Sequence, residues 1–239
     1  MVEPYEKYVR WYLRFNGYFA IENFVIHEPV GGVIPQGGEF DVMAVRFPFS
    51  REEAGFKLEN DPKLGLSSLK DHIDFVIAEV GGGKRKELNK VWQPPDDGGI
   101  KAKRVAYALK WSGFFSDDAV TQRVAKEFQC NCQCRYDRFN CRVIVFAQEH
   151  KSSLQNRGIP QISFREISEW IVGVRSSCYA KRGLGVRSCH NQWDPLILQI
   201  WKIADPMSTV GQTDKVRRIL DLLEEEWKAC KSQDAVART

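Results

Sequence analysis

The sequence predicts an α/β protein in which helices pack against a mixed central β-sheet. Three observations support this prediction. Short runs rich in β-branched and aromatic residues alternate with longer segments whose apolar residues have helical spacing. Their order is one helix, three strands, helices, a strand and further helices, which is typical of helices covering a sheet. With 239 residues, the chain is long enough for one good core, or for one core with a small appendage.

The N-terminal third of the chain contains one predicted helix and three predicted strands. Apolar residues from Tyr5 to Leu13 follow helical spacing, and Asn16–Gly17 ends that helix. A polar excursion over 48–70 reads as an inserted loop with room for a helical turn. The last of the three strands has a near-continuous apolar run, which indicates burial on both faces. Aromatic and β-branched residues predict these strands over 18–26, 39–47 and 74–80.

Helical spacing returns in the middle of the chain. One helix is predicted around 105–109 and ends near Gly113. A second is predicted around 120–128, with Ser116 or Asp117 as its N-cap, because both residue types accept hydrogen bonds from the first turn of a helix.

The C-terminal part contains one more strand and three more helices. The apolar run 141–147 predicts a buried strand. A capping box at Ser163–Glu166 and an Asp194–Pro195 pair each begin a helix, and apolar spacing over 216–227 predicts the last one. We expect the chain to fray beyond Cys230.

These elements divide the chain into two regions. We expect residues 1–175 to form one domain and residues 176–239 to form a helical C-terminal extension packed on the same domain. No apolar stretch approaches the roughly 20 residues that span a bilayer, so no membrane partner is expected. The first residues lack the layout of a signal peptide, which predicts a cytoplasmic protein.

The charge of the chain permits nucleic-acid binding without requiring it. The 35 basic and 31 acidic side chains give a net charge of +4, which is well short of a strongly basic domain. Local clusters are therefore more informative than the total. Candidate contacts to nucleic-acid phosphates are Lys84, Arg85, Lys86, Lys101, Lys103 and Arg104. Taken alone, each of these clusters is more often an ordinary solvated surface.

Three carboxylates stand out by their positions. Asp41 lies inside the second strand, on the face that carries Met43 and Val45, where a carboxylate seldom lies without a partner or an ion. Glu79 lies near the end of the third strand. If these strands are neighbours, two hard oxygen ligands meet at one edge of the sheet, which suits Mg²⁺ or Mn²⁺. Glu6 lies on the flank of the first helix and is either a third site residue or an ordinary boundary glutamate.

The segments around these carboxylates resemble one nuclease superfamily. The strings are GGEFDVMAV, DFVIAEV and a following loop with Leu88–Asn89 and Trp92. They are similar to the PD-(D/E)XK nucleases, in which a glutamate-bearing helix precedes a Gly-Tyr/Phe strand, as Glu6 precedes Gly17–Tyr18 here. The resemblance covers roughly the first 90 residues well. It implies a restriction-endonuclease-like core and Mg²⁺- or Mn²⁺-dependent hydrolysis of DNA, with Asp41 and Glu79 as metal ligands and Glu6 as a helper.

The chain departs from the family at one important position. The family lysine should follow Glu79 at position 81, and this sequence has Gly81. A lysine there orients the attacking water and neutralises charge on the phosphate. Three explanations stay open: Lys84 reaches back from the glycine loop, another lysine such as Lys86 or Lys101 takes the role, or the chain is an inactive relative that still binds nucleic acid. The first is preferred, because Lys84 lies within a short loop's reach.

Two further expectations concern partners and metals. A nuclease that cuts both strands often works as a dimer, so a homodimer is one expected state. Seven cysteines, an odd number, argue against a disulfide framework. Alternate spacing predicts that three of the clustered sulfurs lie on one face of a strand, and it departs from the C-x₂-C knuckles of structural zinc sites. The sequence therefore favours small buried side chains over zinc at Cys130, Cys132, Cys134 and Cys141.

Overall fold

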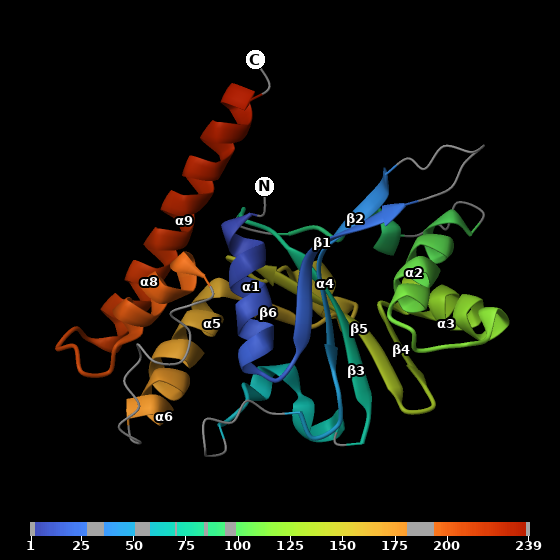
Figure 1. Ribbon diagram of the computed structural model, residues 1–239, viewed down its shortest axis with the longest axis horizontal. Helices are drawn as coiled ribbons and strands as arrows, with labels where there is room; N and C mark the ends of the chain where they lie inside the picture. The colour runs from blue at the N-terminus through green and yellow to red at the C-terminus, as the bar shows by residue number, and fades with distance from the viewer. Residues whose placement is uncertain are drawn as a thin grey trace.

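The protein forms a mixed six-stranded sheet with helices on both faces (Figure 1), as the sequence predicts. A computed structural model describes residues 3–27, 36–50, 58–69, 71–83, 86–93, 99–180 and 194–237. The strands are β1 (Phe19–His27), β2 (Gln36–Arg46), β3 (Ile73–Val80), β4 (Gln133–Tyr136), β5 (Phe139–Ala147) and β6 (Gln161–Ser163).

The sheet has the order β1-β2-β3-β5-β4, and β6 pairs with β5. The first three strands form an antiparallel meander. β5 then lies parallel to β3, after the chain has crossed over through two helices. Parallel neighbours place their carboxyl ends at the same edge, so the chain leaves β3 and β5 on one side of the molecule.

The central position of β3 explains its sequence. All eight of its residues are buried, including Asp74 at one end and Glu79 at the other. An interior strand covered on both faces needs apolar residues on both. The apolar run of β3 therefore reflects burial on both faces, as the sequence predicts. The two buried acids, Asp74 and Glu79, need polar partners.

One face of the sheet is covered by the N- and C-terminal helices. The core on this face joins Val76 and Ala78 of β3 to aromatic side chains of the first helix and to apolar residues of the last two helices. Tyr5 stacks on Phe164, with ring centroids 4.5 Å apart. The helices that build this layer are α1 (Pro4–Phe15), α5 (Phe164–Trp170), α8 (Pro195–Ala204) and α9 (Gln212–Ala237).

The predicted starts and ends of these helices can be compared with the structure. The capping box at Ser163–Glu166 is present, and the side chain of Asp194 accepts from the Leu196 N–H at the start of α8. The expectation of fraying beyond Cys230 is wrong, because α9 continues to Ala237. After α5 the chain continues through the π-helical turn η4 (Ile171–Arg175) into α6 (Ser176–Ala180).

The other face of the sheet is covered by α2 (Ile100–Trp111), α3 (Asp118–Asn131) and the short helix η3 (Lys90–Trp92). Phe75 and Ile77 of β3 pack here against Leu109 and Phe128. Asp117, one of the two predicted caps, accepts hydrogen bonds from the N–H groups of Ala119 and Val120. Short elements complete the fold: η1 (Pro62–Leu64), η2 (Leu66–Leu69) and α4 (Ser152–Asn156).

The C-terminal helices belong to the same core as the rest of the chain. Ile197 and Trp201 of α8, with Ile219 and Leu223 of α9, are buried together with residues of α1 and the sheet. No helix among the described residues is long and apolar enough to cross a membrane. The division at residue 175 stays a prediction.

The predicted arrangement of the cysteines is wrong. Cys130 lies at the end of α3, Cys132 follows it with a φ of 58°, and only Cys134 lies in β4. The three sulfurs therefore do not share one strand face, because a left-handed residue turns the chain between helix and strand. Cys132, Cys134 and Cys141 are buried in the apolar core, as the preference for small buried side chains predicts, whereas Cys130 is exposed.

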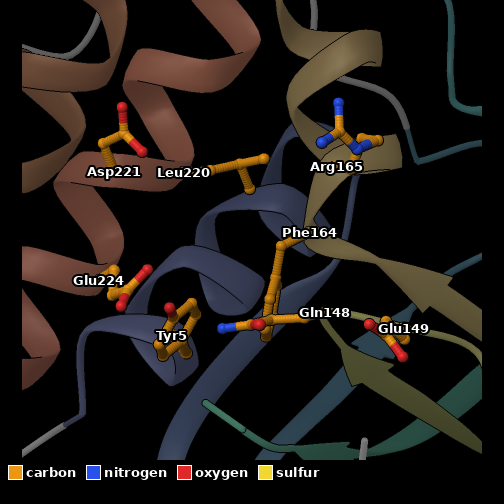
Figure 2. A pocket seen from close by; sticks show the side chains of 8 residues that line it. All are labelled: Tyr5, Gln148, Glu149, Phe164, Arg165, Leu220, Asp221 and Glu224. Atoms are coloured by element: carbon orange, nitrogen blue, oxygen red, sulfur yellow. The ribbon is translucent and has the colours of Figure 1, made fainter. Parts of the chain in front are cut away.

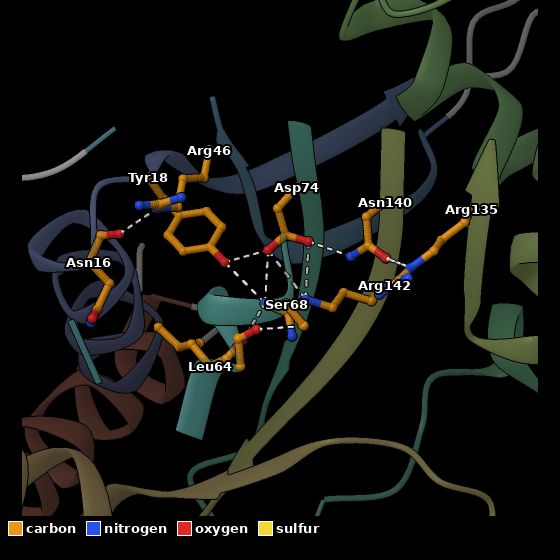
Figure 3. A network of polar contacts seen from close by, with 10 residues as sticks. Asn16, Tyr18, Arg46, Leu64, Ser68, Asp74, Arg135, Asn140 and Arg142 are labelled. Atoms are coloured by element: carbon orange, nitrogen blue, oxygen red, sulfur yellow. Dashed lines mark hydrogen bonds and ion pairs between the residues drawn. The ribbon is translucent and has the colours of Figure 1, made fainter. Parts of the chain in front are cut away.

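The N-terminal end of β3 carries a buried polar network. Figure 3 shows Tyr18, Asn140 and Arg142 around Asp74. Arg142 Nη2 lies 2.8 Å from Asp74 Oδ2, Asn140 donates to Oδ1 at 2.6 Å, and the Tyr18 hydroxyl also donates to this carboxylate. The buried charge of Asp74 is thus paired and hydrogen-bonded, as a buried carboxylate must be.

Candidate active site

Asp41 and Glu79 meet at the opposite end of β3. The antiparallel ladder between β2 and β3 pairs Val42 with Ala78, so the two acids are the next residues on facing strands. Asp41 is 7% exposed and Glu79 is fully buried. Roughly 16 Å of strand, five residues at about 3.3 Å each, separate Glu79 from the network at Asp74.

An irregularity in β2 aims Asp41 at the end of β3. Phe40 and Val42, two residues apart, pack into opposite cores, so the strict alternation of a strand breaks at Asp41. On β1, the facing Asn23 has a φ of 52° and is missing from the ladder. Asp41 Oδ2 accepts a hydrogen bond from the Val80 N–H at 2.6 Å. Local breaks of this kind re-aim side chains beside active sites.

Glu79 is held by the segment that follows the glycine loop. Trp92 Nε1 donates to its Oε1 at 2.8 Å, and the Asn89 N–H donates to its Oε2 at 3.2 Å. The indole is buried between the rings of Phe40 and Phe128, at centroid distances of 5.9 and 5.1 Å. Trp92 thereby fixes the orientation of the carboxylate.

Lys86 brings a positive charge to these two acids. Its Nζ lies 3.2 Å from Asp41 Oδ2 and 3.8 Å from Glu79 Oε2. Its stem passes directly over Gly81: a Cβ at position 81 would lie 2.9 Å from the Lys86 Cβ and 3.0 Å from its Cδ. A side chain at position 81 and Lys86 in this place therefore exclude each other.

Glu6 approaches the same site from α1. Its side chain is 9% exposed, and its Oε2 is buried without a hydrogen-bond partner among the described residues. Burial, followed by repulsion from Asp41, raises the pKa of Glu6 to about 8. Burial and the charge of Asp41 likewise raise the pKa of Glu79, although Lys86 acts in the opposite direction. A cation at this place would relieve both carboxylates.

A cavity of about 430 Å³ opens beside Glu6, Asp41 and Lys86. One wall is acidic and is formed by α1 and β2, with Glu3, Glu6, Glu39 and Asp41. The other is basic and is formed by residues after β3 and on α2, with Lys86, Lys90 and Arg104. Opposed walls of this kind suit a ligand that combines a metal cation with a phosphate.

The donor chemistry of the site fits a divalent cation. Mg²⁺ is commonly bound through one or two carboxylates, with waters and substrate phosphates completing its shell. Asp41 and Glu79 supply two such carboxylates, and the unpartnered Glu6 oxygen is a further acceptor facing the cavity. Within the described part of the chain, no three His, Cys, Asp or Glu side chains converge as a metal site, cysteines included. The fit to Mg²⁺ therefore rests on two protein ligands.

The remaining predicted contacts lie in different places. Arg104 lines the cavity and Lys103 is exposed on the same helix, whereas Lys101 Nζ donates to the Gln93 carbonyl at 2.8 Å. Lys84 and Arg85 lie outside the described residues.

Sequence reasoning did not identify two residues of this site. Lys90 lines the cavity. The one feature of the sequence that could have indicated this is that Lys90 lies between Leu88–Asn89 and Trp92, which belong to the family resemblance. Trp92 is one of the matched letters, but nothing in the sequence indicates that its N–H binds Glu79.

A second cavity, of about 360 Å³, lies between the end of β5 and α9. Figure 2 shows Tyr5 and Phe164 beside it, with Asp221 and Glu224 projecting from α9. Among its described lining residues only Arg165 is basic. Its acidic lining disfavours a phosphate. We assign the chemistry to the first cavity because Glu6, Asp41 and Lys86 line it together.

Comparisons of the chain with protein-family models, with curated proteins and with solved structures found no match. Only the geometry of the site therefore indicates what the protein does.

Proposed function

We propose that the protein is a metal-dependent nuclease with a restriction-endonuclease-like core, which hydrolyses phosphodiester bonds in DNA. The single observation that carries the proposal is the position of the Lys86 side chain. Its ammonium group lies beside Asp41 and Glu79, and its stem crosses the place of the missing side chain at Gly81. The family's lysine function would then be supplied from five positions later in the chain.

The order and pairing of the elements support the same reading. A helix with Glu6 precedes an antiparallel meander that carries Asp41 and Glu79, and helices then lead to a strand parallel to β3. This order agrees with the family features that the sequence resembles. Fold-level agreement is an analogy, so the proposal depends on the side chains.

Each side chain has a role that follows from its position. A divalent cation on Asp41 and Glu79 would supply a bound water of lowered pKa and would polarise the phosphate. Lys86 is placed to orient the attacking water and to stabilise negative charge on the phosphate oxygens. Glu6 offers an unpartnered oxygen as a hydrogen-bond acceptor for that water. Lys90 and Arg104 would hold the neighbouring phosphates.

Cleavage of labelled DNA in Mg²⁺ or Mn²⁺ tests this assignment. We expect Asp41→Ala and Glu79→Ala to abolish cleavage, and Lys86→Ala to lower kcat by about 100-fold or more, as for removal of one electrostatic stabiliser. Lys101→Ala, whose ammonium group binds the Gln93 carbonyl, is the matched control and should retain activity. Lys84→Ala tests the other candidate. If Lys84→Ala abolishes cleavage and Lys86→Ala does not, the role of Lys86 is wrong.

A second candidate function is a nuclease-fold protein that binds nucleic acid without cleaving it. The observation in its favour is that Lys86 already contacts both carboxylates, so part of their negative charge is offset without a metal. This candidate predicts that Mn²⁺ leaves the melting temperature of the wild-type protein unchanged. It also predicts DNA binding that Asp41→Ala does not affect, with no cleavage under any metal condition.

A further inference from the structure

The outer face of α2 carries an exposed stripe of aromatic and basic residues. Ile100, Arg104, Tyr107 and Trp111 are spaced at i, i+4, i+7 and i+11, so they lie along one side of the helix. Ile100 is 44% exposed, Tyr107 38% and Trp111 64%. The opposite side of α2, with Val105, Ala108 and Leu109, is buried against the sheet. The helix therefore buries its core face without using its large aromatic residues.

The charge of α2 is of one sign. Its twelve residues include four basic side chains, at Lys101, Lys103, Arg104 and Lys110, and no acidic one. The Lys110 ammonium pairs with Asp118 at 2.8 Å, and Lys103 is exposed towards the other end of the helix. An aromatic surface interleaved with positive charge fits an anion that has flat rings.

The stripe leads into the active-site cavity. Arg104 lines that cavity together with Asp41 and Lys86. Trp111, at the other end of α2, packs against Phe24 with ring centroids 4.9 Å apart and an interplanar angle of 61°, and more than half of its surface stays exposed. From Arg104 to Trp111 the helix rises roughly 10 Å, a length that about three stacked bases would cover at about 3.4 Å each.

We propose that this stripe is a binding track for single-stranded DNA that guides a strand into the active site. Bases stack on Tyr107 and Trp111, and the backbone phosphates lie near Lys103 and Arg104. The inference rests on the proposed nuclease function and adds a substrate class to it. Unpaired bases are needed because the base faces of a duplex are already stacked on one another and are closed to an aromatic side chain.

Oligonucleotide binding tests the track without cleavage. The background is Asp41→Ala in EDTA, and the probe is a fluorescently labelled 20-mer of thymidine, measured by anisotropy. We expect Trp111→Ala and Tyr107→Ala each to weaken binding about tenfold, since stacking on one aromatic side chain is worth about 1–3 kcal/mol per base. Trp111→Phe should lose less. Phe49→Ala is the matched control, because Phe49 is 78% exposed and lies away from the cavity lining.

The competing occupants of this surface give different results. A 20-bp duplex should bind at least about fivefold more weakly than the single strand if stacking matters. Tryptophan fluorescence should be quenched by the thymidine 20-mer in the wild type and less so in Trp111→Phe. Tighter binding of a uridine 20-mer would overturn the assignment to DNA. A protein or membrane partner predicts that both stripe variants bind the 20-mer as well as the Phe49→Ala control does.

Failure of the track and failure of the nuclease proposal are distinguishable. If the stripe variants bind the single strand normally while Lys86→Ala abolishes cleavage, the track is wrong and the nuclease assignment stands. If no DNA is cut in any metal but stripe variants lose binding, the track stands on a non-cleaving protein. No binding of single strands by the parent protein would overturn the track in either case.

Discussion

At position 81 the absence of a side chain gives Lys86 its place. The Lys86 stem fills the space of a Cβ at Gly81, and its ammonium group lies 3.2 Å from Asp41 Oδ2. A glycine where a lysine is expected reads in the sequence as a lost function. In three dimensions it is compatible with a lysine supplied from elsewhere, because charge acts through distance and not through sequence position.

Whether a lysine at position 86 replaces one at position 81 can be tested by moving the lysine back to position 81. Gly81→Lys alone should not raise cleavage, because its stem would collide with Lys86, and overpacking of this kind costs about 1–3 kcal/mol. Gly81→Lys combined with Lys86→Ala should recover cleavage to well above that of Lys86→Ala alone. Metal-dependent cleavage and denaturant unfolding measure the two effects. Higher activity in the single Gly81→Lys variant would mean that no other lysine acts at the site.

Trp92 is the second residue whose role can be isolated. Trp92→Phe keeps an aromatic ring, smaller than the indole, and removes the N–H that binds Glu79. We expect Mn²⁺ affinity to fall about 10- to 100-fold, as for loss of a group that orients a metal ligand, and the free energy of unfolding to fall by about 1–3 kcal/mol. Phe128→Leu is the control, because Phe128 packs on the same indole without contacting the carboxylate. Equal Mn²⁺ affinities in the two variants, measured by calorimetry, would contradict this role.

At the scale of elements, the glycine loop after β3 is shaped by close packing. A Cβ on Gly82 would lie 2.9 Å from Trp227 Nε1 and 2.9 Å from a ring carbon of Tyr5. The loop thus passes between α1 and α9, and only a residue without a side chain fits there. Gly83, one residue later, has open space around it. The three glycines therefore differ in their surroundings. Gly81 leaves room for the Lys86 side chain, and Gly82 allows close contact with α9.

This difference predicts opposite effects for neighbouring substitutions. Gly82→Ala should lower the free energy of unfolding by about 1–3 kcal/mol, because the added methyl group must displace Tyr5 or Trp227. Gly83→Ala should be neutral or stabilise by about 0.4–1 kcal/mol, because alanine restricts the unfolded chain. Urea unfolding of the two variants gives the comparison. Equal loss of stability in both would mean that the loop does not pack closely on α9.

At the scale of the whole molecule, the carboxylate site opposes folding when it is ionised. The pKa of Glu6 is raised from 4.5 to about 8, first by burial and then by Asp41. Such a group contributes most to stability below its unfolded value and loses that contribution as pH rises towards the folded value. The metal-free protein should therefore lose stability between about pH 5 and pH 8 on account of this residue.

Thermal unfolding in EDTA across this pH range measures the effect. In Glu6→Gln, which cannot ionise, the fall in melting temperature should be smaller than in the wild type. Mn²⁺ should restore more stability at pH 8 than at pH 5 in the wild type, since only the ionised site attracts the cation. A wild-type melting temperature that rises steadily from pH 5 to pH 8 without metal, by as much as in Glu6→Gln, would contradict the raised pKa of Glu6.

Much of the fold could be predicted because its signals are local. Capping residues such as Asp117 and Asp194 and the apolar run of β3 act within a few residues of themselves. The short strands β4 and β6 carry too few residues for a pattern. The cysteine segment was predicted as a strand because alternation alone does not reveal the left-handed turn at Cys132.

The sequence by itself determined the α/β class, the order of the main elements and the unusual placement of Asp41 and Glu79 in apolar strands, because periodicity and a carboxylate in an apolar strand are both visible in neighbouring residues. Only the tertiary structure decided that Lys86 reaches these acids, that Trp92 holds Glu79, and that Arg104 joins the aromatic stripe of α2 to the cavity. These contacts depend on strand register and on loop packing. Both are determined jointly by residues that are far apart in the chain.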